Sequence, residues 1–189
     1  MNEYRLSLCR DGGFQTRAED GNLYIEGYFS VFNREYRMWE GAVETVDPHA
    51  FDETLNDDIR ALVNHDTTLV LGRTTVGTLT LKVDQRGLWG RITINQQDQD
   101  AMNLYNRVAR GDVSQCSFGF VIEEEDVFDR PDGTVEFRLL KVKLREVSVV
   151  TFPAYEDTAV VARKRDFDDH SKRKQEAWAA SMMKKLKGD

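Results

Sequence analysis

LVNHDTTLVLGR, residues 62–73, has an apolar strand that ends at Asn64-His65-Asp66, a turn through Thr67-Thr68, and a second apolar strand. A histidine at such a strand end is held by both strands and still meets solvent. Neutral imidazole accepts a proton near pH 7 and can return it, so His65 is a candidate general base. A histidine between Asn and Asp can equally be a simple turn residue, and that alternative stays open here.

The chain before this stretch has the alternation expected of strands. Residues 22–31, NLYIEGYFSV, mix β-branched and aromatic residues around Gly27, which predicts a strand with a bend or bulge. A short strand is predicted over residues 41–46. Residues 47–55, DPHAFDETL, predict one or two helical turns with Asp47 as the cap and Pro48 at the first helical position. His49 is then a surface residue at a helix start.

The chain after residue 73 predicts a hairpin and one helix. Residues 75–83 and 88–94 are apolar strands around a turn at residues 84–87. Apolar residues then recur at helical spacing at Ala101, Leu104, Tyr105 and Val108. Asp98 or Asp100 can cap the start of this helix, and Gly111 is positioned to end it.

Residues 113–122, VSQCSFGFVI, predict a strand with one apolar face. Alternation puts Cys116, Phe118 and Phe120 on the core face, together with Ser114. Ser117 lies on the other face beside Gly119, which predicts a clear approach for a substrate backbone. Ser114 is the competing nucleophile, and this register makes it the less accessible of the two. Serine is also common in strands without any function.

Two further strands are predicted, over residues 135–142 and 144–151. The second, LREVSVVT, carries Glu146 among apolar residues. Burying a carboxylate costs several kcal/mol unless it is paired or hydrogen-bonded, so Glu146 is expected to have a partner such as an imidazolium or an arginine.

Composition narrows the class of protein. The chain has 189 residues, 40% apolar and 31% charged, as expected for one globular domain with an appendage. The net charge is −7, but nine basic and five acidic residues follow position 162, so residues 1–162 carry −11 and residues 163–189 carry +4. An acidic body argues against nucleic acid as a partner.

Other sequence features indicate a reducing compartment. Cys9 and Cys116 provide neither a disulfide framework nor a zinc cluster, and no apolar run approaches the ~20 residues that span a bilayer. The N-terminal residues show no export signal, so a cytoplasmic location is the expectation. No cofactor and no membrane association are predicted.

The C-terminal residues form a separate segment in this interpretation. Trp178, Met182 and either Lys185 or Leu186 fall at helical spacing among basic residues, which predicts an amphipathic helix. We therefore predict two parts, a body of residues 1–162 and a basic helical tail of residues 163–189. A solvated surface helix is the plainer alternative to a docking or self-cleavage segment.

Three blocks together resemble the prohead maturation serine proteases of tailed phages, the caudoviral prohead serine protease family. They are NHDTTLVLGR with His65, QCSFGF with Ser117 and LREVSVVTFPA with Glu146, and the early segments GYFSVFN and DPHAF add to the match. The resemblance covers about residues 23–161. A more distant similarity, to the herpesvirus assemblin proteases, runs through the Asn-His-Asp segment, although those enzymes have a histidine in place of Glu146.

The resemblance implies a fold and a reaction. The fold would be a mainly antiparallel, assemblin-like β-barrel with a few helices, plus the C-terminal helix. Ser117 would be the nucleophile, His65 the general base and Glu146 the group that orients the imidazole, with oxyanion donors expected in the loop after Thr151. The substrate would be the scaffolding portion of the major capsid protein, and the protease itself, inside the assembling prohead in the host cytoplasm; a homo-oligomer is possible.

Two other functions remain open from the sequence. One is a non-catalytic capsid-assembly or scaffold protein that keeps the protease fold. The other is a metal-dependent hydrolase that uses His65, Asp66 and His49, which the absence of a tight ligand pair on one element disfavours.

Overall fold

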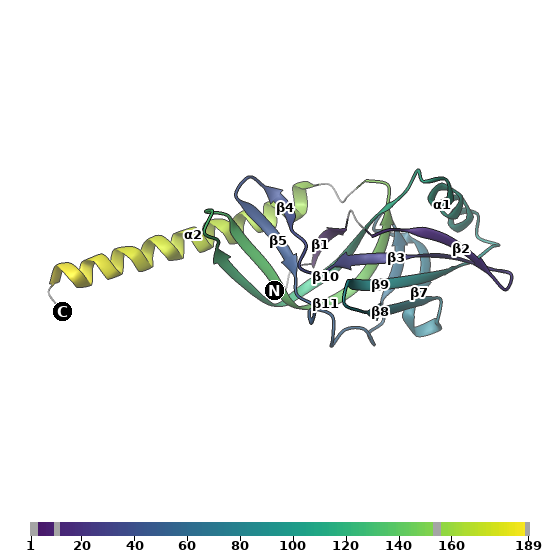
Figure 1. Cartoon of the computed structure of the whole chain (residues 1–189), viewed down its shortest axis with the longest axis horizontal. Helices are drawn as coiled ribbons and strands as arrows, with labels where there is room; N and C mark the ends of the chain where they lie inside the picture. Colours follow the sequence, from purple (N-terminus) through teal and green to yellow (C-terminus); the bar gives the residue numbers. More distant parts are fainter. Residues whose placement is uncertain (1–3, 10–11, 153–155, 188–189) are drawn as a thin grey trace.

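The computed structural model describes residues 4–9, 12–152 and 156–187, which form two β-sheets and two α-helices (Figure 1). The larger sheet has the order β1 (Tyr4–Cys9), β10 (Gln115–Asp129), β11 (Val135–Val150), β5 (Ala42–Val46) and β4 (Tyr36–Trp39), with β6 (Arg60–Val63) and β7 (Asp66–Arg73) attached through β11. The smaller sheet has the order β2 (Gln15–Glu19), β3 (Asn22–Val31), β9 (Gly87–Ile94) and β8 (Leu79–Val83).

The hairpin of β10 and β11 forms the centre of the larger sheet. These two antiparallel strands have 15 and 16 residues; β1, β5 and β6 pair with them directly, and β4 and β7 join through β5 and β6. β11 pairs in parallel with β5 near its start and with β6 near its end, so one strand organises both halves. β1 closes the other side of β10 as an antiparallel edge strand. The end of β11 next to β6 is where Glu146 lies beside the His65 hairpin.

The predicted helix is confirmed as α1 (Gln99–Arg110). The side chain of Asp98 accepts hydrogen bonds from the backbone N–H groups of Asp100 and Ala101, which caps the first turn. Gly111 ends the helix with φ of 87°, a left-handed conformation that favours glycine. Because α1 connects β9 to β10, it carries the chain from the smaller sheet to the larger one.

One hydrophobic core joins the two sheets. Phe118 and Phe120 of β10 are 1% and 0% exposed, as the alternation predicted. The ring of Phe118 packs edge-on against Phe51, with centroids 5.5 Å apart, and Phe51 stacks near Phe32 at 6.2 Å. The core therefore lies on the β10 face opposite to Ser117.

The second helix, α2 (Glu156–Lys187), begins on the body and continues away from it (Figure 1). Arg163 is only 2% exposed and makes ion pairs with Glu44 at 2.7 Å and with Glu125 at 2.5 Å. Phe167 packs edge-on against Trp39, and Lys174 lies 2.9 Å from Asp129. The predicted boundary at residue 163 thus falls inside one helix whose early turns are anchored to the sheet.

The fold class is confirmed as mainly β with a few helices and a C-terminal helix, but several details differ from the prediction. Among the described residues the strands form two sheets without a closed barrel, and residues 135–150 form one strand rather than two. The segment after Asp47 makes successive turns with i to i+3 hydrogen bonds instead of a helix. The strand predicted from residue 75 begins at Leu79, after the short 3-10 helix η1 (Thr74–Val76).

Candidate active site

His65 lies in the tight turn between β6 and β7. Asn64 and His65 have φ of 50° and 62°, so both adopt the left-handed conformation of a two-residue hairpin turn. The turn is therefore at Asn64-His65, and the prediction of a turn at Thr67-Thr68 is wrong because those residues already belong to β7. Residues other than glycine are uncommon in this conformation, although asparagine and histidine are among those that adopt it most often, and the strain persists where neighbouring contacts hold it.

Three hydrogen bonds from β11 and its end fix this turn. The N–H of Asn64 donates to the carbonyl of Val149 at 3.0 Å, and the side chain of Asn64 accepts from the N–H of Thr151 at 2.8 Å. The N–H of His65 donates to the hydroxyl of Ser148 at 3.2 Å. The imidazole is thereby held over the end of the β11 strand.

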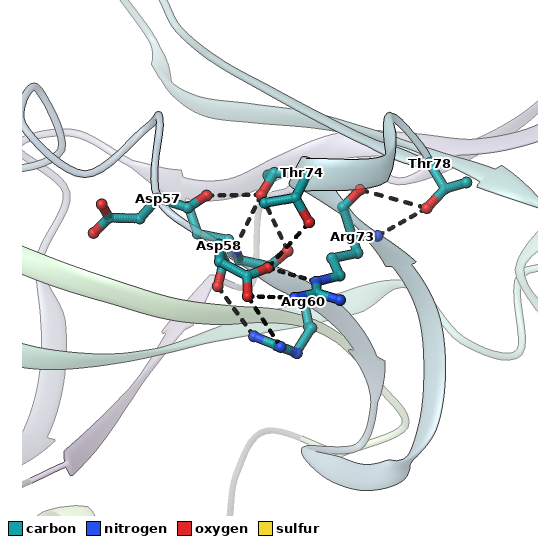
Figure 2. Close-up of polar contacts among 8 residues, drawn as sticks. Asp57, Asp58, Arg60, Arg73, Thr74 and Thr78 are labelled. Atoms are coloured by element: carbon teal, nitrogen blue, oxygen red, sulfur yellow. Dashed lines mark hydrogen bonds and ion pairs between the residues drawn. The ribbon is translucent and has the colours of Figure 1, made fainter.

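Charged groups fix the other end of the same hairpin (Figure 2). The guanidinium of Arg73 binds both carboxylate oxygens of Asp58 at 2.6 Å, and Arg60 adds a contact at 3.1 Å. The hydrogen bond from Arg73 lowers the pKa of Asp58 to about 2. The hydroxyl of Thr74 bridges the backbone, accepting from Ile59 and donating to Asp57. Both ends of the hairpin that carries His65 are therefore tied down.

Glu146 provides the carboxylate that meets His65. Its side chain is 6% exposed, and Oε1 lies 2.6 Å from Nδ1 of His65. The hydroxyl of Tyr4 donates to the same oxygen at 2.9 Å, and the hydroxyl of Ser148 donates to Oε2 at 2.6 Å. The predicted partner of Glu146 is thus an imidazole, and three donors satisfy a carboxylate that would otherwise be costly to bury.

This contact fixes which nitrogen of His65 carries the proton. An ionised carboxylate can only accept hydrogen bonds, so Nδ1 is the N–H donor, and in a neutral imidazole Nε2 then keeps the lone pair. Nε2 is buried and has no hydrogen-bond partner within the described residues. A base nitrogen without a partner is available to accept a proton from a nucleophile.

Ser117 lies on the same face of the larger sheet as Glu146. It pairs directly with Ser148 across β10 and β11, and Gly119 pairs with Glu146. Ser117 is 0% exposed, however, and its hydroxyl donates at 2.7 Å to the backbone carbonyl of Ser7 in β1. The prediction of an open approach to Ser117 is therefore wrong for this structure, because β1 covers it.

Ser114 lies elsewhere than the sequence predicted. It is exposed and precedes β10, which begins at Gln115. The prediction that Ser114 is the less accessible serine is wrong, because the strand that would have turned it toward the core starts one residue later. Although Ser114 is exposed, it is not part of the hydrogen-bonded group of His65, Glu146 and Ser148.

Gly119 makes room for the carboxylate. A Cβ placed on Gly119 would collide with Oε1 of Glu146 and with the hydroxyl of Tyr4. Any larger residue at this position would displace Glu146, Tyr4 or both. The glycine beside Ser117 therefore makes room for the carboxylate, whereas the substrate approach for which the sequence suggested it is covered by β1.

Sequence reasoning missed Tyr4 and Ser148 as members of the site. Ser148 shares the face of Glu146 two residues along the strand, and that alternation was the signal for it. Tyr4 is separated from Glu146 by 142 positions, and no local pattern points to it. Burial and the charge of Glu146 raise the pKa of the Tyr4 hydroxyl, which keeps it a donor.

Two further predictions concern the oxyanion donors after Thr151 and the alternative metal site. The N–H of Thr151 is already used by Asn64, and residues 153–155 lie outside the described part of the chain. His49 is exposed and bonded to Asp52 at 2.9 Å, while Asp66 accepts from Thr68. In the described ranges no three His, Cys, Asp or Glu residues group as metal ligands.

Comparison with known proteins connects this geometry to a family. Residues 13–173 match the family described as Caudovirus prohead serine protease. The chain belongs to this family. The match includes His65, Ser117 and Glu146, and it confirms the resemblance found in the sequence.

Two known proteins are similar to this prohead serine protease family member. The prohead protease of Enterobacteria phage HK97 is 32% identical over 150 residues, which cover 77% of this chain and 62% of that protein. The chain thus spans less than two thirds of the length of that relative. The solved structure of the bacteriophage T4 capsid assembly protease matches with a TM-score of 0.47 and 15% identity, covering 79% of this chain and 99% of that one.

No helix in the described ranges of this family member is long and apolar enough to cross a membrane.

Proposed function

We propose that this chain is a serine endopeptidase that cleaves the scaffolding portion of a phage major capsid protein during prohead maturation, and also cleaves itself. One observation carries the proposal. Nδ1 of His65 is bound to Glu146 at 2.6 Å, while Nε2 is left without a partner on the sheet face that also bears Ser117. That is the arrangement of a base held by an orienting carboxylate.

The reaction assigns one role to each residue. Ser117 Oγ attacks the carbonyl carbon of the scissile bond and its proton passes to Nε2 of His65. The C–N bond then breaks, the amine leaves with that proton, and the acyl group stays on Ser117 until water, deprotonated by His65, releases it. Glu146 holds the imidazole and stabilises it while it is positively charged. For the first step the Ser117 hydroxyl must turn from Ser7 toward His65.

Membership of the family supports the proposed location and partners. A prohead protease acts inside the procapsid, so the chain would be packaged with the major capsid protein and its scaffolding segment in the host cytoplasm. The basic tail, residues 163–189, would serve as a docking segment or a self-cleavage segment. Its charge is positive whereas that of the body is negative, so the tail is the part suited to an acidic partner. A homo-oligomer, and the assignment of residues 1–162 as the protease part, belong to the same proposal.

A second function is a non-catalytic assembly protein that keeps the protease fold. The observation in its favour is that Ser117 is 0% exposed and its hydroxyl is bound to Ser7. In that case the site would be a structural group of hydrogen bonds, and replacing Ser117 would leave capsid maturation unchanged.

Co-expression with the capsid protein of the same phage separates the two functions. Mass spectrometry of the capsid protein should show a new N-terminus with the wild-type chain and none with Ser117→Ala. Ser114→Ala is the matched control, because it removes a hydroxyl three residues away that the site does not use. Maturation that persists with Ser117→Ala would establish the assembly role instead.

A further inference from the structure

Ser148 of β11 lies between the two strands that border the site. It pairs directly with Ser117 of β10 on one side and with Leu62 of β6 on the other. Residues directly opposite on neighbouring strands present their side chains on the same face of the sheet. Ser148 is 0% exposed, and the backbone on both sides of it belongs to the sheet. Its hydroxyl therefore has a fixed place on the face that bears Glu146.

The hydroxyl of Ser148 closes a ring of hydrogen bonds. The backbone N–H of His65 donates to this hydroxyl at 3.2 Å, and the hydroxyl donates in turn to Oε2 of Glu146 at 2.6 Å. The other carboxylate oxygen, Oε1, lies 2.6 Å from Nδ1 of the same histidine. The ring thus leaves His65 through its backbone and returns to it through its imidazole.

This ring restricts two rotations on which a general base depends. The terminal torsion of a glutamate has no sharp preference, so a carboxylate bound at one oxygen can still turn. Glu146 is bound at both oxygens, and Ser148 supplies the bond at the second one. The backbone of His65 has φ of 62°, and the bond from its N–H to Ser148 helps to hold this conformation. Together these contacts set the direction in which Nε2 points.

The same contacts argue against Ser148 as a second nucleophile. A hydroxyl has one hydrogen to donate, and that of Ser148 is directed at Glu146. The oxygen already accepts from the N–H of His65. Neither bond involves Nε2, the nitrogen that takes a proton from a nucleophile. The residue is therefore placed to act on the base through Glu146 and the backbone.

We propose that Ser148 is a positioning residue for proteolysis. It keeps the carboxylate of Glu146 and the imidazole of His65 in the orientation in which Nε2 can take the proton of Ser117. The proposal rests on the proposed function, because it takes those three residues in their proposed roles. It adds a fourth side chain, which touches neither the substrate nor the reacting atoms.

The first arm of the test compares two variants that each remove one hydroxyl. Thr45→Val is the matched control for Ser148→Ala, because Thr45 also donates at 2.6 Å to a buried carboxylate of β11, that of Glu136, outside the site. Both variants should lower Tm. Only Ser148→Ala should lower kcat for a capsid-derived peptide, by about tenfold or more with KM little changed, because misplacing a reacting group by ~1 Å can cost about 100-fold. Equal kcat values for the two variants would overturn the proposal.

A double-mutant cycle tests whether Ser148 acts through Glu146. Once Glu146→Gln has removed the carboxylate, the ring is already open. The double variant should therefore lose little more kcat than Glu146→Gln alone, because residues in one hydrogen-bond network have non-additive effects. Losses that multiply in full would mean that Ser148 acts independently of the carboxylate, which would overturn the proposal.

The last arm does not need catalysis and uses the full chain with Ser117→Ala. NMR of the chain with 15N-labelled histidines follows the Nδ1 proton of His65, which His65→Ala assigns. Adding Ser148→Ala should speed the exchange of this proton with water by about tenfold or more, since a hydrogen bond to a charged group is lost from the ring. Adding Thr45→Val should leave the rate unchanged.

This arm separates the inference from the function on which it rests. An exchange rate that Ser148→Ala does not change would overturn the proposal. If the exchange speeds up while the wild-type chain cleaves no capsid-derived peptide, Ser148 positions His65 and Glu146 as proposed and the proposed function fails.

Discussion

Glu146→Gln removes one charge from the site and leaves its shape almost unchanged. Glu146 accepts from His65, Tyr4 and Ser148, all within 2.9 Å. The glutamine carbonyl can keep the bonds at Oε1, but its amide group faces Ser148, which then loses its acceptor. The variant therefore tests the charge of the carboxylate more than its geometry.

The expected loss follows from the number and kind of these bonds. A hydrogen bond to a charged group contributes about 1.5–3 kcal/mol. At about 1.4 kcal/mol per factor of ten, losing the charge that stabilises the imidazolium should lower kcat/KM roughly 10- to 150-fold. Activity should not vanish, because Ser117 and His65 remain.

The assay is hydrolysis of a capsid-derived peptide by the purified full chain, with thermal unfolding measured on the same samples. Glu136→Gln is the matched control. Glu136 is a buried carboxylate of the same strand, hydrogen-bonded to Thr45 and paired with Arg130, and it lies outside the site. Glu136→Gln should lower stability with little change in kcat/KM. Wild-type kcat/KM in Glu146→Gln would make Glu146 a structural carboxylate and refute the proposed role.

Three further predictions follow from the same geometry. Ser117→Ala and His65→Ala should each abolish cleavage, while their circular dichroism spectra stay those of the folded wild-type chain. Ser117→Ala should lower the free energy of unfolding by about 1 kcal/mol for one lost hydrogen bond. Cleavage by Ser117→Ala that equals that of Ser114→Ala would contradict this. Gly119→Ala should lower both Tm and kcat/KM, because its Cβ collides with Glu146 and Tyr4; unchanged values in both measurements would show that the site tolerates the displacement. A chain ending after Lys174 should still cleave a peptide yet fail to enter particles. A chain ending after Ala162 should lose about 3–5 kcal/mol of unfolding free energy, because Glu44 stays buried without Arg163. Equal denaturant midpoints for the two shortened chains would contradict the anchoring role of Arg163.

The sequence predicted the elements whose local signals agree with their tertiary surroundings. α1 has apolar residues at helical spacing, an aspartate cap and a terminal glycine, and it forms as predicted. β3 covers residues 22–31 as predicted, since alternation and β propensity agree there. The apolar face of β10 was also predicted correctly, because the apolar side chains Cys116, Phe118 and Phe120 alternate along the strand and all three are buried.

The errors lie where distant contacts override local pattern. The turn is at Asn64-His65 and not at the predicted Thr67-Thr68, because β11 holds Asn64 and His65 in a left-handed conformation that the local sequence pattern does not predict. Ser117 is covered because β1, more than 100 positions away in the chain, adds to the edge of β10. Chemistry predicted an imidazolium or an arginine as the partner of Glu146, and the family resemblance indicated His65. The contributions of Tyr4 and Ser148 depend on sheet register.

Covalent capture of the nucleophile tests the central proposal most directly. The reduced full chain is incubated with a fluorophosphonate, and its peptides are mapped by mass spectrometry. The proposed roles predict one adduct, on Ser117, and its loss in His65→Ala, because the hydroxyl reacts only when Nε2 of His65 takes its proton. An adduct on Ser114, or one on Ser117 that survives His65→Ala, would contradict the assignment of His65 and Ser117 as base and nucleophile.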